Sequence, residues 1–445
     1  MINKRELDLL KAALVKLEEG ESGLPEFTPA FDEGAAADVL SRVAERMQDN
    51  YPYYHPQYAG QMLKPPHPVA RMAYALSLWV NPNNHALDGG RASSAMEKEC
   101  IVELGRMFGW DAPLGHLAGG GTMANLEALW VSGRLHPEKR VIASEQAHYT
   151  HSRISEVLGI PFAAAPVDEY GRMDVAAIEA ELKKGDVGTI VVTIGNTGLG
   201  AVDPLPEILR LRDKYAFRIH ADAAYGGYFG IAAELDENPR SAFNVLGEVD
   251  SIVIDPHKHG LQPYGCGCVL FRDPSVGRLY KHNSPYTYFS SGDLHLGEIT
   301  LECSRPGASA VALWATQQLL PLERNGEFAA GLDACLRAAR MFWQKLHNSS
   351  TFTPLMRPEL DIVVYAVNAA TTSESSVKAR QVFVEAAKRE LHLALIELPV
   401  DVVSRYAPEI DADSETVTCL RSVLMKPEHE NWLERITALL EASAV

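Results

Sequence analysis

The chain has 445 residues, of which 47% are apolar and 22% charged, and its formal net charge is −17. This composition suits a globular protein with a large core, and the acidic balance disfavours nucleic acid as a partner. No run of 18 apolar residues is free of a charge or a Pro/Gly break, so we expect no membrane-spanning helix. The first twenty residues are amphipathic and charged, unlike a secretory signal. Six scattered cysteines suggest reduced thiols, so we expect a cytoplasmic protein.

Residues 1–70 predict a helical segment followed by an extended arm. Helical periodicity marks the first 60 residues, whereas the stretch from Tyr51 to Pro68 carries prolines at positions 52, 56, 65, 66 and 68. Proline lacks the backbone N–H and blocks the preceding turn, so a regular helix is excluded there. Such an arm often wraps a partner subunit, although a surface linker explains the composition equally well.

Residues 71–320 predict a large α/β domain built on a mainly parallel sheet flanked by helices. Short apolar runs that alternate with helical segments predict strands at Arg140–Ser144, Thr189–Thr193, Phe217–Ala221, Ser251–Ile254 and Val269–Phe271. Near-continuous apolar strands between helices are typical of a parallel sheet covered on both faces. Ligands of such sheets bind beyond the carboxyl ends of the strands. Gly195, Asp222 and His257 all fall just past a predicted strand.

Residues 321–445 predict a smaller α+β domain. A long helix over 326–346 is followed by predicted strands at 362–367, 393–396 and 416–424 and by a final helix over 429–442. The change of pattern after Pro321 marks the predicted boundary between the two domains.

Lys258 is the first candidate functional residue. It follows an apolar strand and precedes Gly260 and a tight, weakly charged loop. A lysine withdrawn from water has a lowered pKa and can act as a nucleophile toward carbonyl groups. Because most lysines are solvated surface charges, this position alone leaves both interpretations open.

Asp222 ends a predicted strand and is followed by small residues. A helix-capping aspartate is one interpretation. The other is a carboxylate that keeps a heteroaromatic nitrogen protonated, while Ala223 and Ala224 leave room for a flat ring.

Gly119–Asn125 and His148 are the remaining candidate functional elements of this domain. The glycines precede a helical pattern, and the N-terminus of a helix favours an anion such as a phosphate, with Thr122 adding a hydroxyl. His148 follows a predicted strand and is either a structural histidine or a ring that stacks on an aromatic cofactor. Lysine, ring-nitrogen carboxylate, phosphate loop and stacking imidazole are together what pyridoxal 5'-phosphate requires.

These residues carry a family resemblance. The chain resembles the pyridoxal-phosphate-dependent group II amino-acid decarboxylases, a fold-type-I family that includes aromatic amino-acid, tyrosine and glutamate decarboxylases. The family signature around the lysine is matched in spacing by Ser251, Ile252, Lys258, Gly260, Tyr264, Cys266, Val269 and Arg272, with a departure at His259. The resemblance covers residues 51–320 well and the C-terminal part loosely.

The resemblance implies a role for each cofactor-contacting residue. Lys258 would form the Schiff base with pyridoxal phosphate, and Gly121, Thr122 and His257 would hold the phosphate. Asp222 would pair with the pyridine nitrogen, Ala224 would pack beneath the ring, and His148 would stack on it. Thr197 is the safer match to the family's Gly-Thr-Thr segment, because Asn196 replaces the first threonine. No metal is expected.

Substrate-side residues follow from weaker matches. The stretch Asn81–Ala86 is similar to one in bacterial tyrosine decarboxylases, so His85 is a candidate pocket residue and an aromatic L-amino acid is favoured over glutamate or aspartate. The proton donor in the family is usually a tyrosine on a mobile loop, here Tyr288 in preference to Tyr286. Arg305 and Arg421 are candidates for binding the substrate carboxylate. The resemblance also implies a homodimer with active sites at its interface.

Three other functions remain open. Residues 304–307, Ser-Arg-Pro-Gly, also resemble a segment of sphingosine-phosphate lyases, which cleave Cα–Cβ and release an aldehyde. A metal-dependent hydrolase could use His220, Asp222, His257 and His259, but it would leave Lys258 and the glycine loop unexplained. A non-catalytic binding protein on the same fold is the third.

Overall fold

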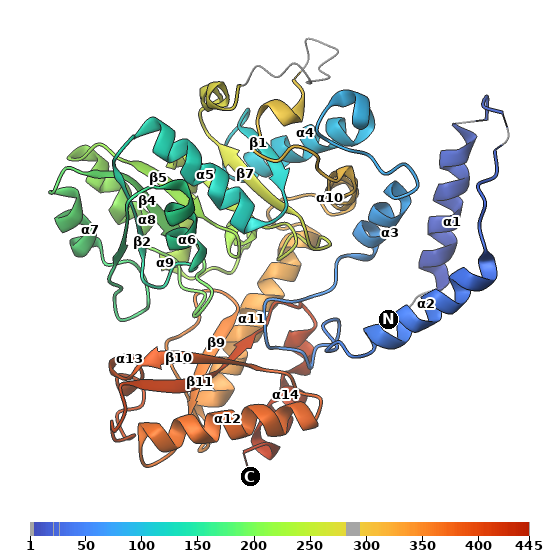
Figure 1. Ribbon diagram of the computed structural model, residues 1–445. Helices are drawn as coiled ribbons and strands as arrows, with labels where there is room; N and C mark the ends of the chain where they lie inside the picture. The colour runs from blue at the N-terminus through green and yellow to red at the C-terminus, as the bar shows by residue number, and fades with distance from the viewer. Residues whose placement is uncertain (1–3, 21, 26, 282–293, 445) are drawn as a thin grey trace.

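The computed structural model describes residues 4–20, 22–25, 27–281 and 294–444 (Figure 1). The larger unit of this described part contains a seven-stranded sheet with the order β1-β7-β6-β5-β4-β2-β3. Its strands are β1 (Leu114–Ala118), β2 (Arg140–Ser144), β3 (Phe162–Ala165), β4 (Val187–Thr193), β5 (Arg218–Asp222), β6 (Ser251–Ile254) and β7 (Gly267–Phe271). β7 runs antiparallel to β1 and β6, and the strands from β6 to β3 are parallel. The predicted α/β class and mainly parallel sheet are confirmed.

The sheet strands are apolar because both faces are covered. Every residue of β4, β6 and β7 is buried, which requires side chains on both faces to avoid water. The helix α5 (Gly121–Leu135) packs on β6 and β7 and beside α6 (Thr150–Leu158). The other helices of this unit are α3 (Pro68–Ser77), α4 (Arg91–Met107), α7 (Val175–Leu182), α8 (Leu205–Arg210), α9 (Glu237–Asn244) and α10 (Gly307–Leu319). The parallel arrangement brings the carboxyl ends of β4, β5 and β6 to one edge.

The smaller unit contains an antiparallel sheet with the order β10-β11-β9-β8. Its strands are β8 (Phe352–Pro354), β9 (Ile362–Val367), β10 (Ala394–Pro399) and β11 (Thr416–Val423), and its helices are α11 (Glu327–His347), α12 (Thr372–Lys388), α13 (Val400–Ser404) and α14 (His429–Ala442). The long helix, the three predicted strands and the final helix are all present. The sequence analysis missed α12 and the short β8.

The N-terminal helices α1 (Lys4–Glu19) and α2 (Glu33–Met47) project from the body of the molecule (Figure 1). Neither helix contains a buried residue. The proline-rich stretch is non-helical up to Pro68, where α3 begins, and it consists of turns and irregular chain. Among the described residues, no helix is long and apolar enough to cross a membrane.

Candidate active site

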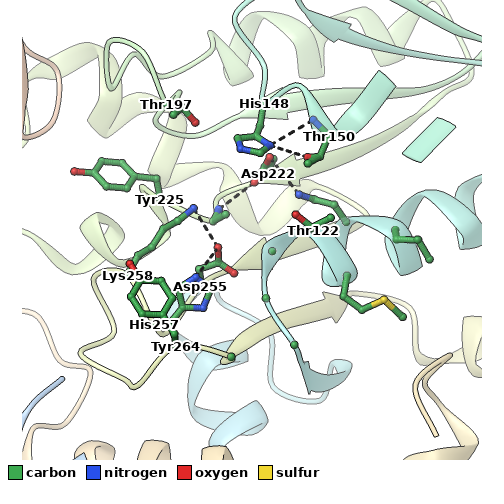
Figure 2. A pocket seen from close by; sticks show the side chains of 18 of the residues that line it. Thr122, His148, Thr150, Thr197, Asp222, Tyr225, Asp255, His257, Lys258 and Tyr264 are labelled. Atoms are coloured by element: carbon green, nitrogen blue, oxygen red, sulfur yellow. Dashed lines mark hydrogen bonds and ion pairs between the residues drawn. The ribbon is translucent and has the colours of Figure 1, made fainter. Parts of the chain in front are cut away.

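A cavity of about 550 Å³ opens at the carboxyl ends of β4, β5 and β6, against the first turn of α5. The eight residues predicted to contact a cofactor all line it: Gly121, Thr122, His148, Thr197, Asp222, Ala224, His257 and Lys258. Figure 2 shows the side chains of Lys258 and Asp222 directed toward the same space from different elements. The fold therefore brings together residues that lie more than 130 positions apart in the chain.

The first turn of α5 forms one end of the cavity. The N-terminal N–H groups of a helix have no carbonyl partner within the helix, and they attract anions. Gly120, the N-cap, has φ +145°, which glycine adopts readily. A Cβ on Gly267 would lie 2.4 Å from the carbonyl carbon of Gly120, so this turn packs directly on β7. The turn therefore presents unpaired N–H groups to the cavity, where the sequence predicts a phosphate.

Asp222 lies at the end of β5 and is 5% exposed. Its Oδ2 accepts hydrogen bonds from His151 Nε2 at 2.8 Å and from Asn125 Nδ2 at 3.3 Å, and Oδ1 accepts from the backbone of Ala224. Burial alone would raise the pKa of Asp222, but the hydrogen bond and charge of His151 and the charge of Lys258 outweigh it and hold this pKa well below its usual value. The cavity thus contains a buried carboxylate that stays ionised.

Lys258 lies opposite Asp222 and next to a second acidic side chain. Its Nζ is 3.1 Å from Asp255 Oδ2, and its side chain is 21% exposed. His257 Nδ1 lies 2.8 Å from the carbonyl oxygen of Cys266, so Nδ1 donates its hydrogen there and Nε2 is left for the cavity. Burial lowers the pKa of His257, which favours the neutral ring.

His148 and Thr197 line the cavity from other loops. His148 Nδ1 lies 2.8 Å from Thr150 Oγ1 and accepts a bond from the Thr150 backbone N–H, which places the ring hydrogen on Nε2. Burial also lowers the pKa of His148. Asn196, in contrast, bonds to Gly171 and Leu199 and supports the turn. Thr197 is therefore the residue of this segment that faces the cavity.

Of the four remaining predicted residues, the three that the structure describes (His85, Arg305 and Arg421) do not line this cavity. Tyr288, like its alternative Tyr286, lies outside the described residues. His85 is held against the 295–298 turn, where its carbonyl accepts from the Gly297 N–H. Arg421 lies in the middle of the smaller sheet, between β10 and β9.

Arg305 is largely committed to a buried ion pair. Its Nη1 lies 2.8 Å from Glu97 Oε1 and donates to the Leu117 carbonyl, and the side chain is 4% exposed. It borders a cavity of about 20 Å³ rather than the main one. Nη1 therefore supports α4 and β1, whereas Nε and Nη2 have no partner among the described residues. Arg305 does not line the main cavity, and its role in binding the substrate carboxylate stays a prediction.

The sequence analysis missed two cavity residues and one buried partner of Asp222. Asp255 lies three positions before Lys258, and His151 lies three positions after His148, so both are one helical turn from a predicted residue. Asn125 follows Thr122 at the same spacing and contacts Asp222. These residues could have been found in the sequence, because each polar side chain lies three positions from a predicted site residue.

The hydrolase alternative is not supported by the positions of its histidines. His220 is bonded between Asn125 Oδ1 and Ser251 Oγ, each at 2.8 Å, and His259 faces Asp361. Among the described residues, no group of three or more His, Cys, Asp or Glu side chains is arranged to hold a metal ion.

The donor set fits pyridoxal phosphate. An ionised carboxylate suits a protonated ring nitrogen, the first turn of α5 suits the phosphate, and Lys258 provides the amine for the aldehyde carbon. Flat, small walls at Ala224 and His148 leave space for a ring between them. Fold and cavity together define a fold-type-I enzyme that depends on pyridoxal phosphate.

Comparisons with known proteins give the family. Residues 127–368, more than half of the chain, match the pyridoxal-dependent decarboxylase conserved domain. The chain belongs to the pyridoxal-dependent decarboxylase family. It is 30% identical to the L-aspartate decarboxylase of Thermococcus kodakarensis, over 79% of this chain and 90% of that protein. It is 26% identical to the L-tyrosine decarboxylase of Enterococcus faecium, over 78% and 74% of the two chains.

Solved structures confirm the fold. The crystal structure of TDC from Oryza sativa with PLP and tryptamine superposes with a TM-score of 0.81 at 16% identity, over 98% of both chains. The apo form of mouse CSAD gives a TM-score of 0.77 at 19% identity, over 93% of this chain and 90% of that one.

Proposed function

We propose that this enzyme decarboxylates an L-amino acid with an uncharged aromatic side chain, such as L-tyrosine, to the amine and CO₂. The observation that carries the proposal is the convergence of Lys258, Asp222 and the first turn of α5 on one cavity. When bound, pyridoxal phosphate supplies an electron sink for the pair of electrons left on Cα when CO₂ departs.

The chain's own residues would hold and polarise the cofactor. Lys258 would supply the amine for its aldehyde carbon, and the α5 N–H groups, Thr122 and His257 would bind its phosphate. Asp222 stays ionised because of His151 and would therefore keep a proton on the ring nitrogen. His148, Ala224 and Thr197 would contact the ring.

Orientation of the substrate decides which bond breaks, because only the bond perpendicular to the ring is weakened. The proton that replaces CO₂ on Cα must come from a positioned acid. We assign this role to Tyr288, which follows the described residues that end at Lys281. The assignment rests on the resemblance alone, because the proton donor of the family is usually a tyrosine on a mobile loop.

The lining of the cavity favours an uncharged side chain. Among the described lining residues there is no arginine, and Lys258 is the sole lysine, whereas Met123, Leu126 and Tyr264 contribute apolar surface and Glu302 a negative charge. A substrate with an acidic side chain would be repelled by Glu302 and would find no second cation. L-Aspartate, the substrate in the name of the Thermococcus relative, is the second candidate.

The enzyme is proposed to be a homodimer. α1 and α2 place apolar side chains such as Leu9, Val39, Leu40 and Val43 in water, with 47–65% of each exposed. α1 contacts α3, and its Glu6 pairs with Arg71, but helices of 15 or 16 residues with no buried side chain are marginal in water. A second copy of the chain that packs on α1 and α2 would cover their exposed apolar side chains and give the N-terminal segment a role in the dimer.

The aldehyde-lyase alternative loses its main support in the structure. The segment that resembles such lyases is used for packing: Ser304 Oγ accepts from Asn83 Nδ2 at 3.1 Å, and Arg305 pairs with Glu97. Residues 304 and 305 therefore contact Asn83 and Glu97 and do not line the main cavity.

A screen tests the proposal directly. The holoenzyme is incubated with each of the twenty amino acids, and released CO₂ and aldehyde are both measured. We expect CO₂ from L-tyrosine at the highest rate, and no CO₂ from a Lys258→Ala variant, to which borohydride reduction should no longer attach the cofactor covalently. Release of aldehyde without CO₂ would contradict the proposal.

A further inference from the structure

A second cavity, of about 530 Å³, shares no lining residue with the candidate active site. It lies where the arm, α11 and the start of α14 meet, and residues 64–68, 327–334 and 426–428 contribute most of its wall. His259, which directly follows Lys258, also lines it. A cavity of this size is typical of a small-molecule site.

Two lysine amines lie in its wall without a carboxylate partner. Lys426 is 3% exposed, and its Nζ donates to the carbonyl of Tyr58 at 2.6 Å. Lys64 Nζ donates to the carbonyl of Met425 at 3.1 Å. An ammonium group offers three hydrogens, and no described carboxylate lies within 4.0 Å of either nitrogen.

A positive side chain lies deep in the cavity, and the negative side chains lie near its surface. Lys426 is buried, whereas Glu327 and Glu428, the lining carboxylates, are exposed. Burial lowers the pKa of Lys64, and burial together with the charge of Lys64 lowers that of Lys426 to about 7. In both cases burial outweighs the opposing charge of Glu428, and an anion bound by the two amines would add the compensation that the wall lacks.

Much of the rest of the wall is apolar, although His67 and His259 also line it. Pro65, Pro66, Leu261, Phe328 and Leu332 surround the space beside the lysines. Inorganic phosphate would satisfy the amines but leave these side chains against water. An aromatic or branched aliphatic body would cover them and gain from burial.

We propose that this cavity is a second ligand site that takes an organic carboxylate with an apolar body, held by the amines of Lys64 and Lys426. The ligand would contact His259, one residue from Lys258, without entering the active site. An amine without a carboxyl group, such as the product of decarboxylation, lacks the feature that the site recognises.

The probe is 3-phenylpropionate, which has a carboxylate and a ring but no amine and so cannot react with the cofactor. It is titrated by calorimetry into holoenzyme whose cofactor has been capped with phenylhydrazine to block the active site. We expect one site per chain and weaker binding of inorganic phosphate. Lys426→Met and Lys64→Met should each weaken binding about tenfold or more, the range for a hydrogen bond between charged groups.

The control is Lys345→Met. Lys345 lies on α11, which contributes to the cavity wall, but Lys345 itself is outside the cavity and pairs with Glu434. This variant should bind the probe like the unaltered enzyme. Methionine replaces a buried amine without leaving a charge unpaired, so melting temperatures of the variants should be unchanged or higher. Unchanged affinity in both cavity variants, or an equal loss in the control, would overturn the proposal. So would loss of subunit association in Lys426→Met, since it would identify a second chain as the occupant.

Discussion

His151 Nε2 lies 2.8 Å from Asp222 Oδ2, and the two side chains are 1% and 6% exposed. A carboxylate accepts hydrogen bonds only, so Nε2 carries the hydrogen, while Nδ1 is buried and has no partner among the described residues. The pair keeps the charge of Asp222 at the end of β5. His151 therefore acts on the cofactor through Asp222 and is a positioning residue.

Replacement of His151 tests that relationship. In His151→Phe the pKa of Asp222 should rise, because burial is no longer outweighed, and kcat should fall about 10- to 100-fold, the effect of one hydrogen bond to a charged group. The ¹⁵N shift of labelled cofactor should move toward that of an unprotonated ring. His151→Gln, which still donates a hydrogen bond, should restore most of both signals; a normal ¹⁵N shift in the phenylalanine variant would refute this role.

Asp222→Asn should reduce kcat about a hundredfold or more, because a neutral amide does not retain the ring proton. Enzyme reconstituted with a cofactor analogue that lacks the ring nitrogen provides the matched comparison. The analogue should lower the kcat of the unaltered enzyme strongly. It should lower the kcat of the Asp222→Asn variant only slightly, because that variant has already lost the same interaction. Equal, additive losses would show that Asp222 acts on something other than that nitrogen.

The buried histidines predict loss of stability in acid. Burial lowers the pKa of His220 and of His429 to about 3 each. Because the unfolded chain binds these protons near pH 6.5, the stabilisation is complete above pH 6.5 and is lost as the pH falls toward 3. Each histidine contributes on the order of 4 kcal/mol to that loss.

Urea unfolding from pH 7 to pH 4 measures this dependence. His220→Gln should flatten the curve, and His347→Gln, at an exposed position of α11, should leave it unchanged. An unaltered slope in His220→Gln would show that other groups cause the loss.

Asp361 connects the smaller sheet to the active-site segments. Its Oδ1 accepts from the hydroxyl of Tyr225 at 2.5 Å, and Oδ2 is 3.2 Å from His259 Nε2, with all three side chains buried. Asp361→Ala should lower the free energy of unfolding by about 3 kcal/mol, because Tyr225 and His259 would each lose a buried, charged hydrogen-bonding partner. It should also weaken cofactor retention, because Tyr225 and His259 adjoin cavity residues. Asp361→Asn should recover part of the stability, and a variant as stable as the unaltered enzyme would contradict the role.

The large sheet and the cofactor pocket were predictable because both depend on local patterns. Apolar runs such as Ser251–Ile254 were placed correctly, and every predicted cofactor residue reaches the cavity. β1 and α12 were missed, since glycine and histidine interrupt the apolar run of β1 and α12 begins with polar serines and threonines that do not signal a helix on their own. The partners of Arg305 and Asp222 were not predictable, because they depend on tertiary contacts between distant segments.

The place of β1 at the edge of the sheet affects how the chain is made. Its sole hydrogen-bonded neighbour is β7, which begins at Gly267, nearly 150 residues later. At 5–20 residues per second, a ribosome needs about 8–30 s to supply that neighbour. During this interval the nascent chain exposes an unpaired strand, so we expect its yield in cells to depend on chaperones that shield such edges and on the speed of translation between the two strands.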